Sequence, residues 1–136
     1  MRDRGGVVVL ADPHQSAMES IRSVLITLFD SIVMVADEES LLHSVTTLRP
    51  DIVVIDPSLP VSCDRNAITL LHGRCPDANI IAVSVHEGRE FADACVQSGA
   101  LAHVVKRKAV RDLPRAVKEV RTYGYSFPVT RDGAAL

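Results

Sequence analysis

The chain has no tryptophan, only 4% aromatic residues, and only three cysteines among its 136 residues. Cys63, Cys75 and Cys95 are odd in number and far apart, a pattern that matches neither a CxxC metal pair nor a disulfide framework. We expect them to be reduced and mostly buried thiols, which is typical of a cytoplasmic protein.

The sequence also lacks a long apolar run and an excess of basic charge. No run approaches the about 18 residues of a membrane-spanning helix, and the opening MRDRGG is too short and polar for a secretory signal. The formal net charge is −2 with acids and bases interspersed, so no basic stripe is available to contact a phosphate backbone. We expect a cytoplasmic protein that contacts no membrane and does not bind nucleic acid by itself.

What the sequence does contain is an alternation of two patterns over the length of one ordinary domain. Short β-branched runs alternate with segments of helical spacing, and most of the runs are apolar at successive positions. That is typical of parallel strands covered on both faces. The predicted strands are Val7–Ala11, Ser31–Ala36, Asp51–Asp56, Asn79–Ser84 and Ala102–Lys106.

Apolar residues three and four positions apart predict a helix after each strand. Asp37 is the expected N-cap of the second helix. Gly73 is expected to end the third helix, and Gly99 suits the left-handed position after the fourth.

The fifth helix is predicted from about Leu113 to Tyr123, with Asp112 as its cap and Pro114 in its first turn. Five such units in succession predict an α/β fold, a doubly wound five-stranded parallel sheet with five helices of the flavodoxin type. Ligands of such a sheet bind outside the carboxyl ends of its strands.

Four predicted strands end in polar residues. Asp12 follows the first strand, Asp56 ends the third, Ser84 the fourth and Lys106 the fifth. Because the carboxyl ends of parallel strands lie at one edge of the sheet, we expect these side chains to meet there.

At these positions the chain resembles a known family, the receiver domains (REC, CheY-like) of two-component response regulators. The resemblance is to those of the LuxR/NarL type, which precede a helix-turn-helix. The matching stretches are VLADPH, LRPDIVVIDPSLP, IIAVSVHE and SGALAHVVKR. The resemblance implies a receiver domain over residues 1–124. Residues 125–136 would then be a tail, or the start of a linker to an output domain absent from this sequence.

The resemblance implies a role for each strand-end residue. Asp56 looks like the phosphoryl acceptor, and Lys106 like the ammonium that pairs with it and then with the phosphoryl oxygens. Ser84 looks like the switch hydroxyl that bonds the new phosphoryl group. His103 stands where the family usually has an aromatic residue whose rotamer follows that hydroxyl, and its protonation would link the output face to pH.

The same resemblance implies a weakened Mg²⁺ site. Asp12, Asp56 and the main-chain carbonyl of Ser58 are the expected ligands, whereas Pro13 replaces a second acid that normally binds the ion directly. Loss of a residue that supports a metal ligand typically lowers metal affinity or activity about 10–100-fold, and we expect the replacement by Pro13 to lower them by at least that much. Ser58 and His86 stand where receiver residues tune how fast water removes the phosphoryl group.

Phosphoryl transfer needs mainly alignment and cations that balance oxygen charge, so no general base is required. The implied function is a phosphorelay protein that accepts a phosphoryl group from a sensor histidine kinase. It is not an enzyme beyond promoting its own phosphorylation and dephosphorylation. A homodimer through the face of the fourth helix, fifth strand and fifth helix is a further expectation, and DNA would be bound only through an output domain.

Two alternatives stay open. One is a pseudo-receiver, in which Asp56 and Lys106 form a structural ion pair and signalling proceeds through protein contacts without phosphate. The other is a small flavodoxin-like enzyme that binds flavin or nucleotide, although no glycine-rich phosphate loop follows VVVLA. His14, His43 and His72 show no paired ligand spacing, and we interpret them as surface or loop residues.

Overall fold

One parallel sheet of five strands, in the order β2-β1-β3-β4-β5, forms the centre of the protein. The computed structural model describes residues 5–62 and 64–126, so Cys63 and the predicted tail from residue 127 on lie outside the described residues. All five predicted strands are confirmed to within one residue at each end. They are β1 (Val7–Ala11), β2 (Ser31–Val35), β3 (Ile52–Ile55), β4 (Ile80–Ser84) and β5 (Ala102–Val105).

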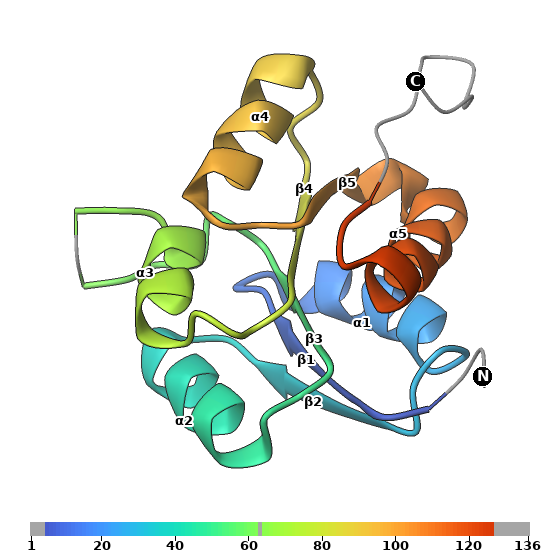
Figure 1. Ribbon diagram of the computed structural model, residues 1–136, viewed down its shortest axis with the longest axis horizontal. Coiled ribbons are helices and arrows are strands. Elements are labelled where there is room, and N and C mark those ends of the chain that lie inside the picture. The colour runs from blue at the N-terminus through green and yellow to red at the C-terminus, as the bar shows by residue number, and fades with distance from the viewer. Residues whose placement is uncertain (1–4, 63, 127–136) are drawn as a thin grey trace.

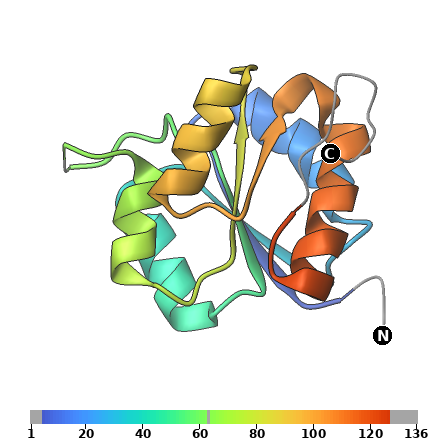
Figure 2. The same ribbon diagram turned by 45° about the horizontal axis from the view of Figure 1, so that its top comes forward.

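Five α-helices connect and cover these strands. They are α1 (Gln15–Leu25), α2 (Glu38–Leu48), α3 (Ala67–Arg74), α4 (Arg89–Ser98) and α5 (Ala109–Tyr123). Figure 1 shows their order around the sheet, and Figure 2 shows α2, α3 and α4 on one side of the sheet with α1 and α5 on the other. The predicted doubly wound fold is confirmed.

The three central strands are apolar on both faces because a helix layer covers each face. Every residue of β3 and β4 is buried, as are the last four residues of β1. The edge strands β2 and β5 are only partly buried. One core cluster lies under α1 and α5 and includes Leu25, Phe29 and Leu113, and the other lies under α2, α3 and α4.

The helix ends agree with the sequence at two positions. Asp37 is the N-cap of α2, where its Oδ1 accepts a hydrogen bond of 2.8 Å from the Ser40 N–H. Gly99 follows α4 with a φ of 127°, and a Cβ there would lie 2.6 Å from Cγ of His72. Helix α3 ends at Arg74, one residue beyond the predicted Gly73.

The predicted start of α5 is wrong. A short 3₁₀ turn over Lys106–Lys108 leads directly into α5, so the helix begins at Ala109 and Lys108, not Asp112, is its N-cap. Pro114 therefore lies inside the helix and not in its first turn. The strand end continues into helical backbone without a loop, and this leaves no position for a separate capping residue near Asp112.

No helix of the described residues is long and apolar enough to cross a membrane. Cys75 and Cys95 are free thiols, Cys95 being buried and Cys75 partly buried. Burial, together with the charge of Asp56, raises the pKa of the Cys95 thiol to about 11. These two cysteines therefore agree with the expected reduced thiols.

Candidate functional site

The four predicted strand-end residues meet at the carboxyl edge of the sheet. Asp12 and Asp56 follow the adjacent strands β1 and β3, and Ser84 ends β4. These three are the buried polar residues of the described chain, with exposed fractions of 1%, 5% and 2% respectively. Burying polar groups is costly unless each has a partner, so their partners define the site.

Lys106 joins the two carboxylates. Its Nζ lies 2.7 Å from Oδ2 of Asp56, to which it donates a hydrogen bond, and 2.7 Å from Oδ2 of Asp12. Its side chain is 11% exposed, so the ion pairs are largely shielded from water. The predicted convergence of two acids and one amine is observed, and we call these three residues with His14 the acidic pocket.

The electrostatics keep this pocket charged. Burial raises the pKa of Asp56, but hydrogen bonds from Lys106 and Ser58 outweigh burial and hold it below its ordinary value. Burial lowers the pKa of Lys106, but attraction by the carboxylates of Asp12 and Asp56 outweighs burial and holds this pKa above its ordinary value. Asp56 is thus an ionised carboxylate with an ammonium partner near neutral pH.

Two similar turns hold the carboxylates. After β1, Oδ1 of Asp12 accepts a 2.8 Å hydrogen bond from the N–H of His14, and after β3, Oδ1 of Asp56 accepts one of 2.8 Å from the N–H of Ser58. In each turn a proline separates the acid from the donor two residues on. Aspartate favours such turns, and proline pre-sets the backbone of the middle residue. The repeated Asp-Pro-X pattern was visible in the sequence as a signal for this geometry.

The interpretation of His14 as a surface or loop residue missed its place in the site. It does lie in a loop with 59% of its side chain exposed, but its Nδ1 is 3.1 Å from Oδ1 of Asp12 and 3.6 Å from Oδ2 of Asp56. Three donor atoms, one each from Asp12, His14 and Asp56, lie within 4.8 Å of one another. The turn across Pro13 brings the imidazole back over the carboxylates, a geometry that ligand spacing in the sequence did not reveal.

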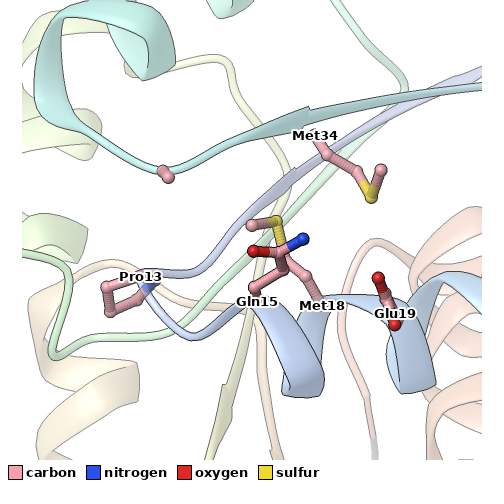
Figure 3. Close-up of a pocket in the computed structure, with 6 residues that line it drawn as sticks. Pro13, Gln15, Met18, Glu19 and Met34 are labelled. Carbon is pink, nitrogen blue, oxygen red and sulfur yellow. The ribbon is translucent and has the colours of Figure 1, made fainter.

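Pro13 itself lines a neighbouring groove of about 280 Å³ between α1 and β2 (Figure 3). The proline ring brings no oxygen or nitrogen ligand to the pocket, as the sequence predicts. The groove is lined by Pro13, Gln15, Met18, Glu19, Met34 and Ala36.

The other end of the edge is built around a serine hydroxyl and aromatic rings. Oγ of Ser84 and Nε2 of His103, on the neighbouring strand β5, lie 3.1 Å apart in a hydrogen bond. The ring of Phe91 lies between two imidazoles, with centroids 5.4 Å from His103 and 4.6 Å from His86. We call these four residues the histidine cluster.

Protonation is unfavourable at the centre of the histidine cluster. Burial, and to a smaller extent the charge of His86, lower the pKa of His103 below its ordinary value. The His86 N–H also donates a 3.2 Å hydrogen bond to Oγ of Ser84. The hydroxyl is therefore held by two neighbouring groups.

The fold and these strand-end groups define a doubly wound α/β protein with a charged pocket at the carboxyl edge of its sheet. Comparison with known proteins places it more narrowly, because the model of the response regulator receiver domain family matches residues 8–118. The chain belongs to this family, and its relatives are regulators of the LuxR/NarL type. The resemblance stated from the sequence is confirmed.

The relatives are distant in sequence. The transcriptional regulatory protein MctR of Rhizobium johnstonii is 26% identical over 123 residues, which are 88% of this chain and 57% of MctR. The DNA-binding transcriptional activator EvgA of Escherichia coli K12 is 27% identical over 120 residues, 88% of this chain and 58% of EvgA. The chain therefore spans little more than half the length of these two relatives.

A solved structure shows the same fold. The LuxR-family two-component response regulator from an Aurantimonas species has a TM-score of 0.77 at 23% identity, over 90% of this chain and 88% of that chain. The chain is a receiver domain of two-component signalling. The individual roles of Asp56, Ser84, Lys106 and His103 remain predictions.

Proposed function

We propose that this receiver domain accepts a phosphoryl group on Asp56 from a phosphohistidine of a sensor histidine kinase. The observation that carries this proposal is the state of the Asp56 carboxylate, which is ionised and fixed between the Ser58 N–H and the Lys106 ammonium. A carboxylate must be ionised and aligned to attack phosphorus, and phosphoryl transfer asks little more of a protein than alignment and charge balance.

In the transfer, one carboxylate oxygen of Asp56 forms a bond to phosphorus as the phosphorus–nitrogen bond of the phosphohistidine breaks. The electron pair of that bond stays with the departing imidazole. The ammonium of Lys106, which lies 2.7 Å from Oδ2 of Asp56, then forms an ion pair with the phosphoryl oxygens. Ser84 leaves its hydrogen bond with His103 to bind the same group.

The donors of the pocket fit a divalent cation, because two carboxylates and an imidazole lie within 4.8 Å of one another. The resemblance gives this ion as Mg²⁺, bound by Asp12, Asp56 and the main-chain carbonyl of Ser58. When bound, it supplies positive charge to the phosphoryl oxygens. Because Pro13 provides no ligand, we propose that phosphorylation is slow, and that Ser58 and His86 tune the loss of the phosphoryl group.

The test is intact-mass measurement after incubation with acetyl phosphate and Mg²⁺. One phosphoryl adduct is expected, formed slowly, and Asp56→Asn should prevent it. Asp77→Asn is the matched control because Asp77 is exposed, and it should leave the adduct unchanged. An adduct that persists in Asp56→Asn would contradict Asp56 as the acceptor.

A pseudo-receiver is the second candidate, and a specific observation favours it. Lys106 already pairs with both Asp12 and Asp56 without a metal ion, so ion pairs within the chain hold the pocket together. The pseudo-receiver is supported if no phosphoryl adduct forms and if the NMR signals of Ser84 and His103 do not change when acetyl phosphate is added.

The partners follow from the same proposal. We propose that the chain acts in the cytoplasm and that its only catalytic role is to promote its own phosphorylation and dephosphorylation. In a longer protein it would control a DNA-binding output domain. The face of α4, β5 and α5 includes Val110, which is 81% exposed, and supports a homodimer there. Light scattering with and without acetyl phosphate distinguishes induced dimers from constitutive ones.

A further inference from the structure

The acidic pocket contains a nitrogen donor whose placement suits a metal ion. Nδ1 of His14 lies 3.1 Å from Oδ1 of Asp12 and 3.6 Å from Oδ2 of Asp56. Ligands bound at about 2.0–2.2 Å and separated by tetrahedral or octahedral angles lie about 3.0–3.5 Å from one another. His14 therefore already has nearly the spacing of a fellow ligand to each acid, and the three donor atoms all lie within 4.8 Å of one another.

The buried carboxylates of the pocket outnumber its one ammonium group. Oδ2 of Asp12 is the one buried side-chain nitrogen or oxygen atom of residues 5–62 and 64–126 found without a hydrogen bond. Lys106 Nζ lies 2.7 Å from it in an ion pair, and the same ammonium also pairs with Asp56. Two carboxylates against one ammonium leave these three side chains with a net negative charge, which attracts a dication.

The donors are held in place before any ion binds. Asp12 and Asp56 are buried, and each carboxylate is fixed by the N–H of the turn that follows its strand. His14 is the exposed member, so an ion has an entry path from solvent beside the imidazole. Preorganised donors with an open side are what a binding site for a partly hydrated ion requires.

The kind of donor decides which ion is favoured. Mg²⁺ prefers oxygen ligands, and the Pro13 side chain supplies none. Imidazole nitrogen suits Zn²⁺, Cu²⁺, Ni²⁺ and Fe²⁺, and the affinity of nitrogen and oxygen sites rises from Mn²⁺ to Cu²⁺ and is lower again for Zn²⁺. A proline at position 13 and an imidazole at position 14 thus favour the same kind of ion.

We propose that Asp12, His14 and Asp56 form a metal site that binds a first-row transition-metal dication in preference to Mg²⁺. On binding, Nδ1 of His14 gives its lone pair to the metal, and the proton of the neutral imidazole is carried on Nε2. This proposal rests on the proposed function only in naming the same pocket, because ion binding requires no phosphoryl transfer.

The experiment titrates the protein with Co²⁺, Zn²⁺ and Mg²⁺ separately, using calorimetry for each ion and visible absorption for Co²⁺. One Co²⁺ or Zn²⁺ is expected per chain, bound at least about tenfold more tightly than Mg²⁺. His14→Ala should weaken Co²⁺ and Zn²⁺ by at least about tenfold and leave weak Mg²⁺ binding unchanged. Because His14 is exposed, this variant should fold, which circular dichroism checks.

His43→Ala is the matched control, since His43 is exposed on α2 outside the pocket, and it should bind Co²⁺ as the wild type does. Pro13→Asp should raise the affinity for Mg²⁺ and so reduce the preference for Co²⁺ and Zn²⁺ over Mg²⁺. Equal affinity for Mg²⁺ and Zn²⁺, or an equal loss in His14→Ala and His43→Ala, overturns the proposal. A phosphoryl adduct without Co²⁺ binding removes only this inference, whereas Co²⁺ binding without an adduct under any ion removes only the proposed phosphorylation.

Discussion

The acidic pocket and the histidine cluster lie at the same edge of one sheet but are stabilised by different physical forces. In the pocket, Asp12 and Asp56 are 1% and 5% exposed, and a single ammonium pairs with both. In the cluster, Ser84 and His103 share one hydrogen bond between groups that are neutral near neutral pH.

This difference bears on how each region responds to change. Removing one member of a buried charged group leaves another charge without compensation, which is costly. Breaking a hydrogen bond between neutral groups costs much less, because water or a nearby carbonyl can replace the partner. We infer that the pocket is the rigid half of the edge, and that the cluster is the half in which a signal can rearrange side chains cheaply.

The largest effect should follow from removing the shared ammonium. In Lys106→Met two buried carboxylates lose their partner, and we expect the free energy of unfolding to fall by about 3–5 kcal/mol. Urea unfolding at neutral pH measures the change. Lys118→Met, at an exposed position of α5, is the control and should have little effect.

Adding Asp12→Asn to Lys106→Met should restore part of the loss, because only one buried charge then remains unpaired. If Lys106→Met is no less stable than Lys118→Met, the pocket is not held by its charges, and the contrast between the two regions disappears.

The sequence was a good guide to the parts of the molecule fixed by repeating patterns. The strands follow from apolar residues at successive positions, which a sheet covered on both faces requires, and the convergence of Asp12, Asp56 and Lys106 follows from the parallel order. These inferences need no knowledge of side-chain rotamers.

The features that the sequence did not predict depend on local backbone geometry. His14 enters the pocket because a turn across Pro13 folds the chain back toward Asp12. Helix α5 begins at Ala109 because a 3₁₀ turn continues the strand end into the helix. Neither event leaves a periodic signal, since each is decided by a few dihedral angles and one or two hydrogen bonds.

A smaller effect is expected in the histidine cluster, and it should depend on pH. His103→Phe keeps a ring beside Phe91 but removes the hydrogen bond to Ser84, so we expect a loss of about 1 kcal/mol near neutral pH. The pKa of His103 is lowered in the folded protein, so the unfolded chain binds more protons as the pH falls. Wild-type stability that depends on His103 is therefore complete at high pH and declines as the pH falls below the unfolded value of about 6.5.

Urea unfolding of wild type and His103→Phe between about pH 5 and 8 checks this, and the difference between them should shrink toward acid. His43→Phe serves as the control for an exposed histidine on α2. A difference that grows toward acid would mean that the folded state favours the charged imidazole, and the cluster would then resemble the pocket.

The smallest effect is expected at the ion pair between Glu87 and Arg107, which joins the loop after β4 to the 3₁₀ turn after β5. Arg107 Nε donates a 2.8 Å hydrogen bond to Glu87, but the two side chains are 63% and 46% exposed, so water and salt screen the pair. Arg107→Gln should therefore leave urea unfolding unchanged at about 0.15 M salt. Hydrogen exchange in the loop 85–88 should be slightly faster in the variant at low salt. A clear loss of stability at the higher salt would show that charge also holds the neutral half of the edge, and the contrast with the acidic pocket would be one of degree only.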